Sequence, residues 1–175
     1  MPYFLNSITP INQFTKTTKG KYFVDKSPMI NEINKLIGIK DRFICITRPR
    51  RFGKTVNAMM LAAYYSKNAD FRGLFDNLKI SESPSYLKHL NKHNVIYLTL
   101  NELPKPNCTY EEFIENYTKD LINDIIETYP KIKIDDSKSL SKIFSKVYSE
   151  TNESFIFIID EWDYIFNNNL FTKED

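Results

Sequence analysis

Apolar positions recur along the chain with two different periods, and the two periods alternate. Stretches in which apolar side chains recur every three or four residues predict amphipathic helices. These stretches are residues 27–38, 54–67, 83–90, 109–129 and 140–148. Short, nearly continuous apolar runs predict buried strands at 42–47 (RFICIT), 95–100 (VIYLTL) and 154–159 (SFIFII). Strands that alternate with helices predict an α/β fold, a mostly parallel sheet covered by helices on both faces.

Several helix boundaries carry their own local signals. Ser27 followed by Pro28 is typical of an N-cap and the first helical position. Thr109 with Glu112 three residues later is the pattern of a capping box. Pro130 must follow the long helix, because proline inside it would remove a backbone hydrogen bond.

Composition places the chain among ordinary soluble domains. It has 175 residues, of which 42% are apolar and 26% charged, enough for one domain with a core. The net charge of +2 gives no direct signal for nucleic-acid binding. No apolar stretch has the length of a membrane span, and the N-terminus lacks the features of a signal peptide. We therefore expect a cytoplasmic protein that does not enter a membrane.

Cysteine and histidine suggest no metal site. Cys45 and Cys108 fit no metal or disulfide spacing. Because Cys45 lies inside an apolar run, we expect a buried free thiol. His89 and His93 are four residues apart, but HLNKH lacks the glutamate of H-E-x-x-H and a third ligand is not evident. The interpretation is two surface histidines.

The loop after the first predicted strand has the composition of a phosphate-binding loop. Gly53 lets the backbone pass close to a phosphate, Lys54 supplies a cation, and Thr55 supplies a hydroxyl for Mg²⁺ at the start of a helix. The usual first glycine is missing, since Arg48 stands there, and Pro49 lacks an N–H. The alternative is a strand-to-helix turn that contains Gly-Lys-Thr by chance. The same choice applies to the arginines of the loop, which either contact phosphate or form a solvated basic surface. The nucleotide-binding candidates in this loop are Arg48, Pro49, Arg50, Arg51, Phe52, Gly53, Lys54, Thr55 and Val56.

A second motif follows the last predicted strand. FIFIIDEWD at 155–163 is an apolar run that ends directly in Asp160 and Glu161. An aspartate in this position can bind Mg²⁺ beside the threonine hydroxyl. The neighbouring glutamate can act as a general base on the water that attacks the γ-phosphate. Many strands end in acidic residues, so this motif alone is weak evidence for a nucleotide site. It becomes stronger evidence because it follows the Gly-Lys-Thr loop in the sequence, in the order that such a site requires.

Three stretches together resemble the predicted AAA-ATPase-like family of P-loop ATPases. TRPRRFGKT at 47–55 resembles an arginine-rich variant of the phosphate loop, and IIDEWD at 158–163 resembles the acidic strand end. YFVDKS at 22–27 resembles the signature before the first helix. The resemblance covers nearly the whole chain. It implies a P-loop NTPase-like three-layer sandwich that binds ATP with Mg²⁺.

The resemblance also implies roles for matched positions. Lys54 would hold phosphates and act in catalysis, Thr55 and Asp160 would hold Mg²⁺, and Glu161 would activate water. By analogy with related ATPases, the segment before the first helix lies against adenine. That analogy adds Tyr22, Phe23 and Asp25 as candidates, with Val24 beside them. The alternative is that Phe23 and Val24 pack under the first helix.

The resemblance finally suggests how the chain is organised. We expect residues 1–175 to form the N-terminal part of a P-loop ATPase domain, with the signature and first helix in 1–40 and the nucleotide-binding core in 41–175. Its C-terminal strands are expected to be absent, and longer family members resemble proteins with a C-terminal nuclease-like domain. P-loop ATPases commonly assemble, so a homo-oligomer is a further expectation without an assigned interface. Two other hypotheses remain: a nucleotide-gated regulatory switch, and a degenerate scaffold that does not hydrolyse ATP.

Overall fold

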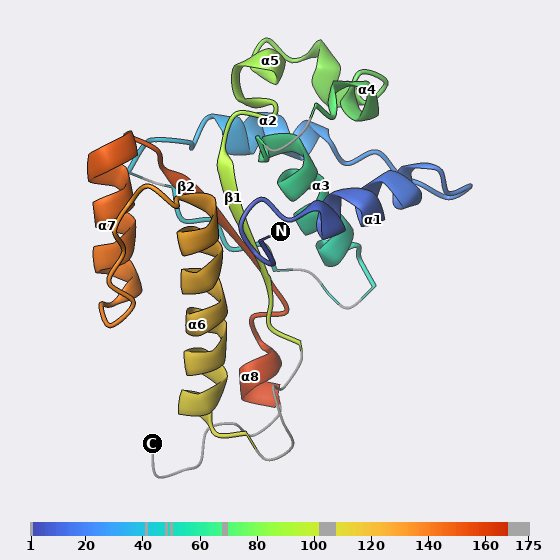
Figure 1. Ribbon diagram of the computed structural model, residues 1–175. Coiled ribbons are helices and arrows are strands. Elements are labelled where there is room, and N and C mark those ends of the chain that lie inside the picture. The colour runs from blue at the N-terminus through green and yellow to red at the C-terminus, as the bar shows by residue number, and fades with distance from the viewer. Residues whose placement is uncertain are drawn as a thin grey trace. The chain divides into compact units, whose positions relative to one another are not determined.

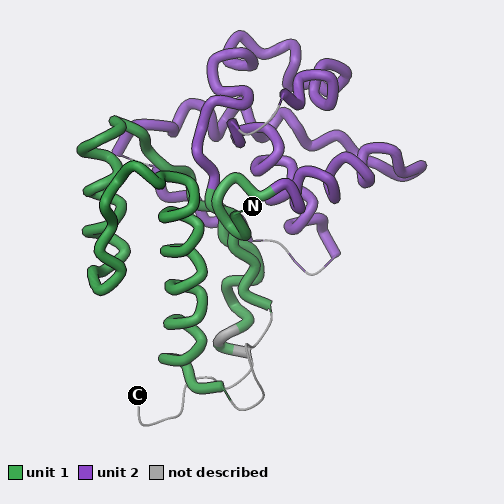
Figure 2. Tube along the Cα trace, viewed as in Figure 1, with its two compact units in different colours: residues 1–7, 96–175 green, residues 8–95 purple. Residues whose placement is uncertain are grey.

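The computed structural model describes residues 2–40, 42–47, 49, 51–67, 70–101 and 108–167. Its elements in chain order are α1 (Ile8–Thr18), α2 (Pro28–Asn34), α3 (Lys54–Tyr65), α4 (Arg72–Phe75), η1 (Lys79–Glu82), α5 (Tyr86–His89), β1 (Asn94–Thr99), α6 (Tyr110–Thr128), α7 (Leu140–Thr151), β2 (Phe155–Asp160) and α8 (Tyr164–Asn167) (Figure 1). The chain forms two compact units (Figure 2). Unit 1 comprises residues 1–7 and 96–175, and unit 2 comprises residues 8–95.

Unit 1 is built on the pairing of β1 with β2, which run parallel (Figure 1). Helices α6 and α7 pack on this pair and share one apolar core with it. The buried members of the core are Phe4, Leu5, Ile96, Leu121, Ile122, Ile125, Ile143 and Val147. Phe144 of α7 joins β2 directly, since its ring lies 4.8 Å from the Phe155 ring and 5.4 Å from the Phe157 ring. The strand pair therefore packs against helices from its own unit.

The described sheet has two strands, and β2 is only partly covered. Phe157 and Ile159 are each 48% exposed, whereas Ile158 and Asp160 between and after them are buried. This alternation is that of a strand with one buried face. The described residues thus form an α/β structure with a small parallel sheet, and they do not show the predicted three-layer sandwich.

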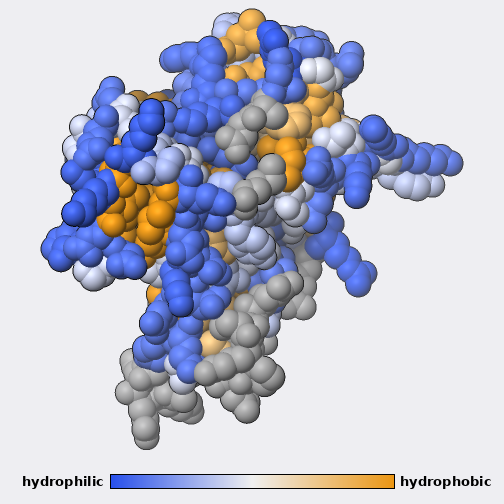
Figure 3. All heavy atoms as spheres, viewed as in Figure 1, coloured by the Kyte–Doolittle hydropathy of each residue, from blue (hydrophilic) through white to orange (hydrophobic). Residues whose placement is uncertain are grey.

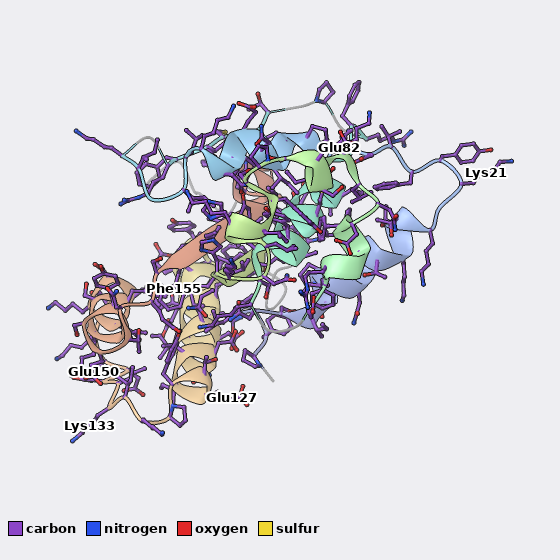
Figure 4. All side chains as sticks on the ribbon, turned by 90° about the horizontal axis from the view of Figure 1, so that it is seen from above. Lys21, Glu82, Glu127, Lys133, Glu150 and Phe155 are labelled. Atoms are coloured by element: carbon purple, nitrogen blue, oxygen red, sulfur yellow. The ribbon has the colours of Figure 1, made fainter. Side chains whose placement is uncertain are left out.

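Polar and apolar surfaces of unit 1 are sharply divided. The space-filling view shows apolar side chains reaching the surface beside α6 and α7 (Figure 3). The charged side chains of Glu127 on α6, Glu150 on α7 and Lys133 in the connection between these helices lie at the periphery of the unit (Figure 4). The long helix α6 begins as its sequence predicts. Thr109 accepts a hydrogen bond from the N–H of Glu112, whose carboxylate accepts one from the N–H of Thr109.

The first residues of the chain are tied to α6 by a buried carboxylate. Asp124 accepts hydrogen bonds from three consecutive N–H groups, those of Tyr3 at 2.7 Å, Phe4 at 2.5 Å and Leu5 at 2.9 Å. Leu5 also forms an antiparallel bridge with Ile96 at the start of the unit 1 part of β1. The N-terminal segment is therefore part of unit 1, although unit 2 lies between it and Ile96 in the sequence.

Unit 2 is organised around α3, against which α1 packs. Phe14 of α1 stacks on Phe75, with 5.8 Å between ring centroids, and Phe75 meets Tyr64 of α3 edge-on at 5.5 Å. The sequence analysis did not predict α1. Its segment ITPINQFTKTT contains four threonines and a proline, which have weak helix propensity. Burial of Pro10, Ile11 and Phe14 compensates for this.

A buried polar network joins α2 to α3. The side-chain amide of Asn34 donates to the hydroxyls of Tyr64 and Ser85. Its carbonyl oxygen accepts a hydrogen bond of 2.7 Å from the hydroxyl of Tyr65. Burial raises the pKa of both tyrosines, so they stay neutral donors. Because every polar atom of Asn34 has a partner, the network fixes the end of α2 on α3.

The prediction of a strand at 42–47 was wrong. These residues are exposed and form no strand, with Phe43 87% exposed. A strand needs a neighbour for its N–H and C=O groups, and the described sheet pairs only β1 with β2. Cys45, predicted to be buried, is accordingly exposed, while Cys108 is buried. The prediction of two surface histidines was also wrong, because His89 is 7% exposed and its Nδ1 lies 3.0 Å from Nε2 of His93.

Candidate functional site

The predicted phosphate loop ends in a helix that has no side-chain cap. Gly53 is the N-cap residue of α3 and has φ 76°, a left-handed conformation that glycine adopts without strain. The first turn contains no acidic residue, and Gly53 offers no side-chain acceptor. An α-helix leaves the N–H groups of its first turn without acceptors inside the helix. The start of α3, with Lys54 and Thr55 in that turn, is therefore suited to an anion.

The rest of the loop is exposed. Arg51 also has a left-handed backbone, with φ 67°, as Gly53 has two residues later. Pro49 is exposed and Phe52 is 59% exposed, whereas Val56 in the first turn of α3 is partly buried. Arg48 and Arg50 lie outside the described residues.

The signature at 22–27 lies in the same unit as the loop. Tyr22 is 85% exposed, and the ammonium of Lys21 lies 5.6 Å from its ring centroid. Phe23 meets Phe14 of α1, a helix that the sequence analysis did not predict, edge-on at 6.1 Å. Val24 is 67% exposed. The roles of Tyr22 and Phe23 toward adenine remain predictions.

Asp25 has a structural role that the sequence did not reveal. Its carboxylate accepts hydrogen bonds of 2.8 Å from the N–H groups of Ser27 and Lys79. Burial alone would raise the pKa of Asp25, but these hydrogen bonds lower it below its ordinary value. Ser27 was predicted as an N-cap, yet it makes no cap bond and its hydroxyl accepts from the N–H of Ile80 instead. Asp25 and Ser27 together fix the signature to η1.

Lys26, between these two residues, reaches the phosphate loop. Its Nζ donates a hydrogen bond of 2.8 Å to the carbonyl oxygen of Phe52. A Cβ atom added to Gly53 would lie 3.3 Å from the same Nζ. The sequence analysis did not select Lys26, although the family resemblance included it within YFVDKS. This contact joins two of the three stretches that carried the resemblance.

The acidic strand end lies in unit 1. Asp160 is the last residue of β2 and only 6% exposed. Its Oδ1 accepts the N–H of Glu161 at 3.1 Å, whereas Oδ2 is buried without a hydrogen-bond partner. Glu161 has φ 53°, a strained conformation for a residue other than glycine. A buried carboxylate oxygen without a donor and a strained neighbour are features that often mark functional sites.

Tyr97 on β1 is a neighbour of this acidic pair that the sequence analysis missed. Burial raises the pKa of Tyr97, and the negative charges of Asp160 and Glu161 raise it further. The sequence signal that could have identified Tyr97 was its hydroxyl group inside the apolar run VIYLTL. Tyrosine in a strand is ordinarily a packing residue, so this signal is weak.

The residues present fit Mg²⁺ better than a structural metal. Among the residues that the structure describes, no three His, Cys, Asp or Glu side chains gather as metal ligands would. Mg²⁺ usually binds through one or two protein oxygens, substrate phosphates and water. Asp160 offers an oxygen of this kind, since its Oδ2 has no hydrogen-bond partner. Thr55 offers a hydroxyl of the same kind in unit 2.

These observations define a class: an α/β protein with a Gly-Lys-Thr turn at a free helix N-terminus and a buried aspartate at the end of a parallel strand. A comparison with known protein families narrows this class to one family. The sequence model of the family described as "Predicted AAA-ATPase" matches residues 9–175. The chain belongs to this family. A search of the curated proteins and a search of the solved structures gave no match. Across the described part of the chain, no helix combines the length and the apolar character needed to cross a membrane.

Proposed function

We propose that the chain is an ATP-binding P-loop module that hydrolyses ATP in the presence of Mg²⁺. The observation that carries the proposal is the free N-terminus of α3, with Gly53 in a left-handed conformation and Lys54 and Thr55 in the first turn. Membership of a predicted AAA-ATPase family supports ATP as the anion. In this proposal the signature and first helix lie in 1–40 and the nucleotide-binding core in 41–175 of a P-loop ATPase domain, whose fold is a three-layer sandwich.

The residues would share the chemistry of phosphoryl transfer to water. Lys54 and the first N–H groups of α3 hold the β- and γ-phosphates and neutralise their charge. Thr55 and Asp160 are the proposed oxygen ligands of Mg²⁺, which would neutralise the charge that develops on the phosphates. Glu161 accepts a proton from the attacking water as its oxygen bonds to the γ-phosphorus. The bond from that phosphorus to the β–γ bridging oxygen breaks, which leaves ADP and inorganic phosphate.

Calorimetric titration of Mg²⁺-ATP tests the binding half of the proposal. The wild-type chain is expected to bind, and Lys54→Ala is expected to weaken binding at least about tenfold, because a charge-assisted hydrogen bond to phosphate is lost. Lys16→Ala is the matched control, since Lys16 is an exposed lysine on α1. Equal affinity for Lys54→Ala and wild type would contradict the assignment of the loop.

Measurements of ATP hydrolysis and ATP binding distinguish the three hypotheses, which are an ATPase, a nucleotide-gated switch and a degenerate scaffold. Binding with hydrolysis above background supports the ATPase. Binding without hydrolysis favours a nucleotide-gated switch, in which ATP orders a segment of the protein. The absence of binding, and of any rise in melting temperature at saturating Mg²⁺-ATP, favours the scaffold.

A further inference from the structure

Lys26 holds its ammonium at the phosphate loop from outside that loop. It belongs to the signature at 22–27, and the carbonyl that it binds, at 2.8 Å, is that of Phe52, the residue before Gly53. The 3.3 Å separation between its Nζ and a Cβ built on Gly53 places the charge beside the turn itself. Lys21, directly before this signature, instead projects away from the ribbon (Figure 4).

The backbone on both sides of Lys26 is fixed. Asp25 is bound to the N–H groups of Ser27 and Lys79, and buried Ser27 is bound to the N–H of Ile80. Pro28 follows at the start of α2. A lysine loses side-chain entropy when it is immobilised. Anchoring its backbone on both sides lowers the further cost of holding its ammonium in one place.

The charge of Lys26 has no acidic partner among the described residues. Its side chain is exposed, and the carbonyl of Phe52 uses one of its three N–H donors. A neutral carbonyl leaves the positive charge uncompensated, so the ammonium retains donors and charge for an anion. The loop lacks one donor of its own, because Pro49 has no N–H.

We propose that Lys26 is a second phosphate-binding lysine, which contacts the phosphates of the bound nucleoside triphosphate together with Lys54. The inference rests on the proposed function and names a residue in that same site. In the structure, the Phe52 carbonyl holds Lys26 beside Gly53. With nucleotide bound, its free N–H groups donate to phosphate oxygens.

Calorimetry with two variants of Lys26 tests the proposal. Lys26→Gln removes the charge at similar length, and Lys26→Arg keeps it. We expect Lys26→Gln to weaken Mg²⁺-ATP binding about tenfold in low salt, at roughly 50 mM, and less at roughly 300 mM, because salt screens the lost attraction. Lys26→Arg is expected to retain most of the affinity. Lys16→Gln, which makes the same change of charge on α1, is expected to bind as the wild type does.

A different result is expected if Lys26 only stabilises the loop through its hydrogen bond to Phe52 and does not contact phosphate. This alternative predicts that Lys26→Gln lowers the melting temperature of the nucleotide-free protein and that the loss of affinity does not depend on salt. That result would overturn the proposal, as would wild-type affinity of Lys26→Gln at both salt concentrations. If the wild-type chain itself fails to bind Mg²⁺-ATP, the proposed function fails and the inference falls with it.

Discussion

Gly53 and Glu161 of the candidate site both have left-handed backbones, and the free-energy cost of this conformation differs between them. Gly53, with φ 76°, adopts the conformation freely, and any side chain at this position would also approach Lys26. Glu161, with φ 53°, adopts it at a cost on the order of 1 kcal/mol. Strain that persists in a glutamate next to a buried aspartate is consistent with the catalytic role proposed for Glu161.

Glu161→Gln tests this role without changing the backbone. Glutamine has the same shape, so we expect Mg²⁺-ATP binding to be retained. We expect hydrolysis to fall by about 10²–10⁴-fold, because the amide cannot accept the proton of water. Single-turnover hydrolysis measures the effect, with Glu150→Gln on the exposed surface of α7 as the control. Equal turnover in Glu161→Gln and wild type would remove Glu161 from the mechanism.

At the scale of elements, the N-terminal segment depends on one side chain of α6. The carboxylate of Asp124 accepts hydrogen bonds from the N–H groups of Tyr3, Phe4 and Leu5. In Asp124→Asn, an NH₂ group, which is itself a donor, replaces one of the carboxylate oxygens and faces these N–H groups. Because buried donors then lack an acceptor, we expect the free energy of unfolding to fall by about 2–4 kcal/mol.

Urea unfolding measures this change. Asp120→Asn is the matched control, since Asp120 lies one turn earlier on α6 and is only partly buried. Its effect is expected to stay within about 0.5 kcal/mol. Coincident unfolding midpoints for the two variants would show that Asp124 does not hold the segment.

The contact between His89 of α5 and His93, the residue before β1, makes the free energy of unfolding depend on pH. Burial lowers the pKa of His93 to about 4, and the positive charges of His89 and Lys92 add to this. Its ring also meets Tyr65 edge-on, and the pKa of His89 is lowered by burial, Lys88 and Lys92. Between pH 6.5 and about 4 the unfolded chain therefore binds a proton that the folded chain does not. Stability is complete above pH 6.5 and is lost as the pH falls through this window.

His93→Gln is expected to reduce that loss. The protonation of His93 costs the wild-type protein roughly 1–2 kcal/mol between neutral pH and pH 4, a value reduced for the partly exposed ring. Urea unfolding of both proteins at several pH values measures the slope. The same slope in His93→Gln and wild type would assign the pH dependence to other groups.

The elements that the sequence predicted well are those whose signals are local. The capping box at Thr109, the proline at the start of α2 and the helical period of 54–65 all reappear in the structure. The strand at 42–47 failed because its existence depends on a neighbouring strand, which an apolar run cannot reveal. The loop motif and the acidic strand end were visible in the sequence. The contact of Lys26 with Phe52 joins residues 26 positions apart, and no spacing rule predicts it.

At the scale of the whole molecule, the chain leaves unit 1 after residue 7 and returns to it at residue 96. Unit 2 contains the signature and the Gly-Lys-Thr loop, and unit 1 contains the acidic strand end. The sequence predicted the α/β class from the alternation of helices and strands. It did not predict this division, because membership of a unit depends on contacts between residues far apart in the chain.

The tie between the N-terminal segment and Asp124 has a consequence for the order of events during synthesis. Phe4 is added to the nascent chain 120 residues before its carboxylate partner, Asp124. At roughly 5–20 residues per second, the segment waits about 6–24 s for Asp124. Throughout that time the apolar side chains of Phe4 and Leu5 lack their native core. This interval is when a nascent chain is open to capture by a chaperone, and codons that slow translation before residue 124 would lengthen it.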